Sequence, residues 1–228
     1  VAGAMFGVAQ ERDGFSPLAT GALSRQLPEG EWRFAAPPRD PDLAVLGLLL
    51  GSYAFTRYKK KKDRDIRFCV PGGVDAEMLR RRAEAVFLAR DLVNTPAGDM
   101  GPASLEKAAR EVARAHKASV EVVAGDDLLK KNFPMIHAVG RAAAEAPRLI
   151  DLGWGPKDAP KLTLVGKGVC FDTGGLDIKP SSGMLLMKKD MGGAANVLAL
   201  AAMVMGAKLD VRLRVLIPAV ENAIAGNA

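Results

Sequence analysis

The residues with the clearest chemical potential lie in one glycine-rich segment, residues 164–196, directly after a predicted strand. Its amines and carboxylates could bind a metal ion or polarise a carbonyl: Lys167, Asp172, Asp177, Lys179, Lys188, Lys189 and Asp190. Open α/β sheets place their sites on loops after strand ends, and paired glycines let backbone approach a ligand closely. The same composition also fits a solvated surface connection whose lysines and aspartates pair with one another. Composition alone leaves both interpretations open.

Other common catalytic signatures are missing from the sequence. Its two histidines, His116 and His137, form no HExxH motif, and there is no GxSxG elbow. The GKG at residues 166–168 lacks the hydroxyl residue that a phosphate-binding P-loop has after its lysine, and no GxGxxG occurs. We therefore expect structural histidines and no nucleotide binding.

Four short motifs within the glycine-rich segment have the order and spacing of a known family signature. They are VGKG at residues 165–168, FDTGG at 171–175, IKP at 178–180 and MKKDMGGA at 187–194. Two further stretches agree, RDLVNTP at residues 90–96 and PAVENAIAGNA at 218–228. The chain resembles the leucyl aminopeptidases, the M17 family of dinuclear metallopeptidases. The resemblance covers residues 75–228 well and the preceding residues only loosely.

The resemblance assigns roles to five residues. It makes Asp172 a carboxylate that bridges two divalent metal ions, and Lys167 and Asp190 ligands of the more loosely held ion. It makes Lys179 the catalytic residue, a charged group that polarises the scissile carbonyl. Met187 would line the pocket for the first side chain of the substrate, which Asp172 and Lys179 would also contact.

The cofactors that the resemblance implies are two divalent ions, Mn²⁺ or Zn²⁺, with Mg²⁺ as an alternative. Carboxylate oxygens suit these ions. A lysine can be a ligand only as the neutral amine, which burial and a neighbouring dication both favour. In the family reaction, a water held between the metals attacks the carbonyl while the free α-amine of the substrate binds one metal. The implied activity is an aminopeptidase, a hydrolase that releases N-terminal residues from peptides with a leucine-like preference.

The resemblance also implies a second ligand cluster. In the family, a motif of the form NTDAEGR follows the GNA stretch, supplies two more carboxylates, and carries an arginine that holds a bicarbonate beside the attacking water. No NTDAEGR occurs in the sequence, which runs from Val1 to Ala228. We therefore expect a fragment that holds half of the site, binds at most one metal weakly, and is an inactive peptidase by itself.

Regular alternation of helices and strands after residue 95 must position these side chains. Helices are predicted over residues 102–117, 126–131 and 192–206, and strands over 119–123, 148–152, 161–169 and 211–217. Strands that alternate with helices of this length predict a mostly parallel sheet covered on both faces. We expect an α/β fold whose mixed, mostly parallel sheet is flanked by helices in three αβα layers.

Three regions are predicted along the chain: a smaller, truncated N-terminal α/β domain at residues 1–73, a linking helix at 74–95, and an incomplete catalytic domain at 96–228. The first region should contain a helix over residues 41–53 and a strand over 66–70. Gly47 and Gly51 lower the helix propensity of the former.

The composition is that of a globular protein. With 228 residues, 49% of them apolar and 25% charged, the chain can bury a sizeable core. Its longest apolar stretch, residues 43–50, is far short of the roughly 20 residues that span a bilayer, and no secretory leader opens the chain. Cys69 and Cys170 have no CxxC spacing, so reduced thiols are expected. We expect a cytoplasmic protein without membrane contacts, and the resemblance implies a homohexamer that acts on peptides with a free amino terminus.

Two alternatives come from other parts of the pattern. Much of the net charge of +6 lies in a basic run, residues 57–67, which could bind nucleic acid or form a solvated hairpin turn that blunts an edge strand. Asp172-Thr173-Gly174 spells the DTG of aspartic proteases, but those sites need two such carboxylates on all-β scaffolds. The helical alternation argues against the second alternative, and nucleic acid is not the expected partner.

Overall fold

The computed structural model describes residues 3–5, 16, 18–36, 38–60 and 64–227. Lys61 and Lys62 of the basic run lie outside the described residues. The chain divides into two compact units within one helix, α3 (Ala76–Asn94): the first unit reaches Phe87 and the second begins at Leu88. Each unit is described separately below.

The first unit is a small α/β assembly. It contains a 3₁₀ turn η1 (Ala19–Ala22), helices α1 (Leu23–Gln26) and α2 (Pro41–Ser52), and strands β1 (Gly30–Trp32) and β2 (Ile66–Phe68). The strands pair in parallel, so the alternative that the basic run forms a hairpin is wrong. Because a parallel pair needs a crossover, the chain passes through α2 between the two strands.

Helix α2 confirms the helix predicted over residues 41–53. The Asp40 carboxylate caps its first turn by accepting from the Leu43 N–H at 3.0 Å. Close packing explains its two glycines. A side chain at Gly51 would overlap the Gly21 carbonyl oxygen, and one at Gly47 would come within 2.9 Å of the Leu18 carbonyl oxygen. The glycines that weaken the helix locally therefore allow it to contact η1 closely.

The linking segment is helical as predicted. Helix α3 begins after Asp75, whose carboxylate accepts from the Met78 N–H at 2.9 Å, and ends at Asn94, two residues before Pro96. Leu79 and Leu92 are buried on its apolar stripe, and charged side chains occupy the opposite side.

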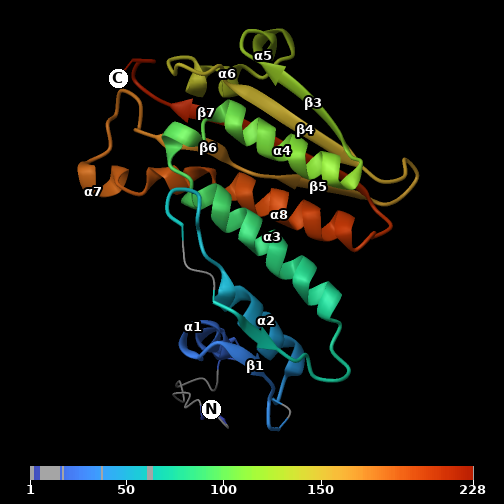
Figure 1. Ribbon diagram of the computed structural model, residues 1–228. Coiled ribbons are helices and arrows are strands. Elements are labelled where there is room, and N and C mark those ends of the chain that lie inside the picture. The colour runs from blue at the N-terminus through green and yellow to red at the C-terminus, as the bar shows by residue number, and fades with distance from the viewer. Residues whose placement is uncertain (1–2, 6–15, 17, 37, 61–63, 228) are drawn as a thin grey trace. The chain divides into compact units, whose positions relative to one another are not determined.

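The second unit is built on a five-stranded mixed sheet (Figure 1). Its strands are β3 (Ser119–Ala124), β4 (Arg148–Trp154), β5 (Lys161–Val165), β6 (Gly168–Asp172) and β7 (Arg212–Asn222). Strand β4 lies antiparallel between β3 and β7, whereas β5 and β6 run parallel to β7. Two of the four pairings in this sheet are parallel and two are antiparallel, and the separate β1–β2 pair is parallel, so the predicted α/β class with a mixed sheet flanked by helices is confirmed.

The single strand predicted over residues 161–169 is instead two strands in line along β7. Val165 pairs with Leu216 and Gly168 with Ala219, so the register continues across the interruption at Gly166 and Lys167. The close approach of the next helix explains the break: a side chain at Gly166 would come within 2.6 Å of the Gly193 carbonyl oxygen. The interruption matters because Lys167 leaves the sheet at this point.

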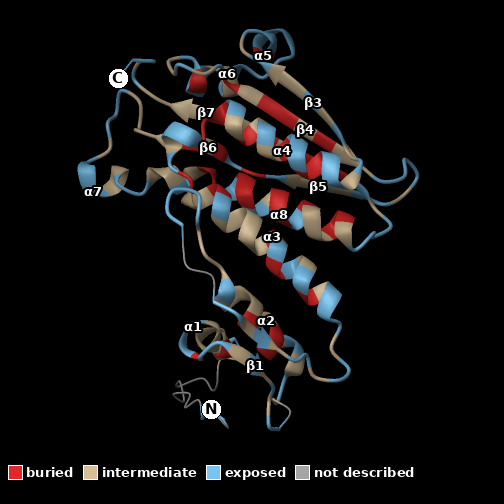
Figure 2. Cartoon of the chain, viewed as in Figure 1, coloured by how far each residue is buried: buried red, intermediate tan, exposed pale blue. Residues whose placement is uncertain are grey.

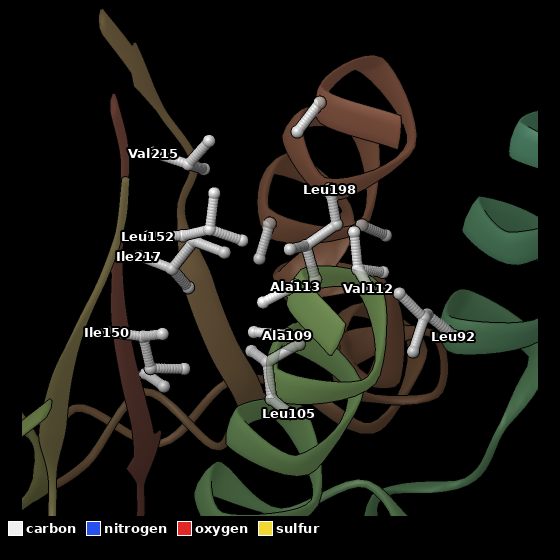
Figure 3. Packing of buried hydrophobic residues seen from close by; sticks show 14 of the residues in the cluster. Leu92, Leu105, Ala109, Val112, Ala113, Ile150, Leu152, Leu198, Val215 and Ile217 are labelled. Atoms are coloured by element: carbon white, nitrogen blue, oxygen red, sulfur yellow. The ribbon is translucent and has the colours of Figure 1, made fainter. Parts of the chain in front are cut away.

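Two long helices, α4 (Pro102–His116) and α8 (Gly192–Gly206), cover one face of the sheet together with the end of α3 (Figure 1). Ile150 and Leu152 of β4 and Val215 and Ile217 of β7 face them across a close-packed core (Figure 3). Burial is concentrated between the sheet and these helices (Figure 2). This core holds the strands that end at the site.

Short helices α5 (Asp127–Lys130) and α6 (Pro134–Gly140) lie at one end of the second face of the sheet. There Gly140 approaches the side chains of Pro147 and Val220. In the middle of that second face, Arg214 pairs with Asp151 at 2.6 Å, with the arginine side chain 57% exposed. The third layer of the predicted αβα arrangement is therefore confined, among the described residues, to one end. No described helix is long and apolar enough to cross a membrane.

Candidate metal centre

The segment after β6 folds back on itself, so that residues several positions apart meet. Gly174 and Gly175 have φ angles of 91° and 67°, a region that favours glycine, and a side chain at Gly174 would overlap the Asp177 carbonyl oxygen. The Lys179 N–H donates to the Thr173 carbonyl at 2.9 Å and closes the turn. The turn therefore returns Lys179 to the end of β6, where Asp172 lies.

Asp172 is held by three donors. Its Oδ1 accepts from the Gly174 N–H at 3.0 Å and from the Asn222 side-chain amide at 2.7 Å, and its Oδ2 lies 3.2 Å from the Lys179 ammonium. Burial raises the pKa of this carboxyl group, but the three donors outweigh burial and hold the pKa below its ordinary value. Asp172 is therefore an oriented, ionised carboxylate with only 16% of its side chain exposed.

Asp190 is partnered differently. It lies on the 3₁₀ turn η3 (Met187–Met191), with its Oδ2 2.9 Å from the Lys167 ammonium. That oxygen is buried, yet no donor reaches it in hydrogen-bonding geometry, including Lys167. Because the Lys167 side chain is 59% exposed, solvent screens its charge and the pair is a weak one. Asp190 thus presents a buried oxygen that a cation could satisfy.

This arrangement fits a divalent ion. Buried carboxylate oxygens are the donors that Mn²⁺ and Mg²⁺ prefer, and an orphaned one is costly unless a cation or donor meets it. Lys167 is adjacent, but its exposure means that a neighbouring dication, rather than burial, would have to favour its neutral form. Among the described residues, no three His, Cys, Asp or Glu side chains gather as a metal site. The candidate centre is thus two carboxylates, each beside a lysine.

The burial of the glycine-rich segment bears on its two interpretations and favours a site. Lysines and aspartates do pair, as the surface interpretation expects, but the Asp172 and Asp190 side chains are only 16% and 14% exposed. Asp177 and Lys189 are exposed and belong to the solvated part of the segment. A surface connection does not bury its carboxylates, so this part of the chain has the character of a site.

Met187 lies at the start of η3 and is half-buried. Asn222, which the sequence indicated only as part of the PAVENAIAGNA stretch, is a site residue that residue-by-residue reasoning missed. Its side chain binds Asp172, and its carbonyl accepts from both the N–H and the hydroxyl of Thr173, at 3.0 and 2.8 Å. Asn222 reaches Asp172 because the ends of β6 and β7 pair, and the spacing of residues in the sequence does not reveal that pairing.

Neither cysteine is suited to be a nucleophile, and both are free thiols. Burial, reinforced by the carboxylates of Glu145 and Glu221, raises the pKa of Cys170 to about 12. A hydrogen bond to Glu31 is the main cause that raises the pKa of the exposed Cys69. Both thiols therefore stay protonated near neutral pH.

The basic run is partly used within the first unit. Arg64 donates to the backbone carbonyls of Arg25 and Leu27, and Arg67 pairs with Asp65 at 3.2 Å. The Arg57 guanidinium lies over the Tyr58 ring, 5.7 Å from its centroid. These contacts give several members of the run a structural role, which does not favour the nucleic-acid alternative.

Comparison with known families decides the membership of the chain. The model of the "Cytosol aminopeptidase family, catalytic domain" matches residues 87–228, more than half of the sequence. The chain belongs to the cytosol aminopeptidase family. This confirms the resemblance to leucyl aminopeptidases, and the DTG alternative is excluded together with its all-β scaffold.

Relatives with similar sequences extend the match into the first unit. A probable cytosol aminopeptidase of Geobacter sp. (strain M21) is 41% identical over an alignment of 207 positions that covers 84% of this chain and 42% of the relative. One of Leifsonia xyli subsp. xyli is 37% identical over an alignment of 241 positions that covers 99% of this chain and 49% of the relative. The chain thus spans about half the length of the curated relatives it matches.

Solved structures of the family share the fold. The cytosol aminopeptidase from Coxiella burnetii superposes with a TM-score of 0.84 at 44% identity, covering 97% of this chain and 52% of that one. The bottromycin maturation enzyme BotP in complex with Mn superposes with a TM-score of 0.81 at 34% identity, covering 93% and 48%. One structural relative of this chain therefore binds manganese.

Proposed function

We propose that this chain supplies the first ligand cluster of a dinuclear, metal-dependent aminopeptidase that releases N-terminal residues with a leucine-like preference. The observation that carries the proposal is the pair of buried carboxylates, Asp172 and Asp190, each beside a lysine, in a chain of the cytosol aminopeptidase family. The manganese complex of BotP supports Mn²⁺ as one of the ions, with Zn²⁺ as the other candidate and Mg²⁺ as an alternative.

Three residues would hold the ions: Asp172 as the bridging carboxylate, and Lys167 and Asp190 at the more loosely held ion. When bound, the ions would supply an activated water and a positive charge for the α-amine of the substrate. The donors to Asp172 keep its carboxylate ionised and oriented without any metal, because Gly174 and Asn222 both donate to Oδ1. Asp172 is therefore prepared to bind before a cation arrives.

Lys179 is proposed to act as the oxyanion donor. Its ammonium lies 3.2 Å from Asp172 Oδ2 and keeps one third of its side chain exposed, so it is held at the site without being enclosed. A fixed positive charge beside the scissile carbonyl stabilises the negative charge that develops on its oxygen. Asp172 would orient this ammonium, while both residues contact the substrate.

Met187 is proposed to line the pocket for the first side chain of the substrate, since a flexible thioether adapts to varied apolar shapes. The resemblance further supports a bicarbonate beside the attacking water, peptides with a free amino terminus as substrates, a homohexamer and a cytoplasmic location for the whole protein. These remain parts of the same proposal.

The test is hydrolysis of a leucine anilide by the complete encoded polypeptide. We expect activity with Mn²⁺ or Zn²⁺, its loss on chelation, and its recovery when the ion is restored. Lys189→Ala, which changes an exposed neighbour in the same segment, is the matched control and should hydrolyse normally. Hydrolysis that chelation leaves unchanged would contradict the metal-dependent mechanism.

A further inference from the structure

Lys188 makes a contact that the proposed chemistry does not use. Its ammonium donates to the Asn94 carbonyl at 2.9 Å and to the Val93 carbonyl at 3.2 Å, across more than ninety residues of sequence. The side chain is partly buried, whereas that of the neighbouring Lys189 is exposed. A partly buried ammonium bound to backbone carbonyls holds two segments together.

The carbonyls that Lys188 reaches are those at the end of α3. The last four carbonyls of a helix lack partners within it, and they form the negative end of the helix dipole. The Thr95 N–H and hydroxyl both donate to the Asp91 carbonyl, at 3.0 and 2.7 Å. The following residue, Pro96, has no N–H to offer. Lys188 therefore provides charged donors where the chain beyond the helix cannot.

The geometry of η3 explains why this contact matters for the site. In a 3₁₀ turn, side chains three residues apart lie on the same face. Met187 and Asp190 therefore share one face, and Lys188 shares another with Met191, which is fully buried. The ammonium contact and the Met191 side chain anchor the same face, so they set the rotation of the turn. That rotation determines where Met187 and Asp190 point.

We propose that Lys188 is a positioning residue that clamps η3 onto the end of α3 and thereby holds Asp190 and Met187 in place. The clamp itself is a property of the metal-free chain. Its consequence for metal binding rests on the proposed function. Asp190 depends on such an anchor because its own carboxylate has only the weak Lys167 contact to hold it.

The first test measures backbone amide hydrogen exchange in the metal-free 228-residue chain. The reporter is the Gly192 N–H, which donates to the Lys189 carbonyl at the end of η3. Lys188→Met keeps the length of the side chain but removes its donors, and should speed this exchange about tenfold. Lys188→Arg retains charged donors, and Lys189→Met changes an exposed neighbour. In both variants the exchange rate of the Gly192 N–H should therefore stay within about twofold of that in the parent. The Ile150 and Leu152 amides in the core should be unchanged in every variant.

The second measurement is Mn²⁺ affinity by electron paramagnetic resonance on the same variants of the complete encoded polypeptide. Lys188→Met should weaken binding about tenfold, as for other residues that orient a ligand, and Lys188→Arg should restore it. If the Gly192 N–H exchanges as slowly in Lys188→Met as in the parent, the proposed clamp is wrong, whatever the measured Mn²⁺ affinity. Faster exchange in Lys188→Met, together with a complete parent polypeptide that binds no Mn²⁺, would support the clamp and contradict the proposed metal site. If Lys188→Met does not fold, Lys188→Leu, which also lacks donors, takes its place, and parent-like exchange in it overturns the proposal.

Discussion

The two carboxylates of the candidate centre differ in how they are held. Asp172, at the end of β6, receives donors from Gly174, Asn222 and Lys179. Asp190, on η3, keeps one buried oxygen without a hydrogen bond and lies beside the exposed ammonium of Lys167. One carboxylate is thus fully satisfied by the protein and the other is not.

Asp172 is therefore preorganised to bind a cation, whereas Asp190 is not fully satisfied by its neighbours. The Asp172 carboxylate is oriented by its own turn and by the neighbouring strand, so binding a cation would cost it little reorientation. The Asp190 oxygen is desolvated and has only the exposed Lys167 ammonium to compensate it among the described residues, so a cation there would relieve an existing cost. Four predictions follow from this contrast, ordered by the size of the expected effect.

The largest effect is expected from Lys179→Ala in the complete encoded polypeptide. Loss of one oxyanion donor typically lowers kcat by about 10²–10³, and Mn²⁺ affinity should change little because Gly174 and Asn222 still orient Asp172. Steady-state kinetics with a leucine anilide and a parallel Mn²⁺ titration measure both quantities. Lys167→Ala should instead weaken one metal. Equal metal loss in the two variants would mean that the roles of the lysines are wrongly assigned.

Asn222→Ala tests whether orientation of Asp172 contributes to metal binding. Removing the amide donor should weaken Mn²⁺ binding by about 10–100-fold, the usual cost of losing a group that orients a ligand. The matched control is Asn196→Ala, which removes an exposed amide from α8. Titration of both variants should show a loss in the first alone, and similar affinities would remove Asn222 from the site.

Paired substitutions compare the two carboxylates without any metal. Asp172→Asn should lower the free energy of unfolding by about 1–2 kcal/mol, because the charge that three donors bind is lost. Asp190→Asn should change it by less than about 0.5 kcal/mol or raise it, since the charge removed is buried and poorly compensated. Urea unfolding in the presence of a chelator measures both. A larger loss for Asp190→Asn would reverse the comparison.

The smallest effect is the pH dependence of stability. The pKa of Asp172 is lower in the folded chain than in the unfolded chain, where it is about 3.9, so the unfolded state binds more protons. Its contribution is complete above that pH and is lost as pH falls through the lowered folded pKa. Urea unfolding from pH 5 downward should show a shallower decline for Asp172→Asn than for the parent, by up to about 1 kcal/mol. Parallel curves would contradict the assignment.

Much of the fold was predictable because its signals are local. Helix α8 has the predicted bounds, Gly192–Gly206, and α2 differs from its prediction by one residue. The break between β5 and β6 was not predictable, because Gly166 and Lys167 interrupt the strand where the start of α8 approaches it. Helix α6 was missed as well, since its seven residues are too few to establish a helical period.

The sequence by itself determined the family and the donor types. These depend on residue identity and short spacing, which act through local backbone geometry. Only the tertiary structure decided that Asn222 binds Asp172, that Lys188 reaches the end of α3, and that Lys167 is exposed while Asp190 is buried. Such contacts join residues far apart in the chain, so they depend on strand register and on how helices pack against the sheet. Neither of these is encoded in the spacing around any single residue.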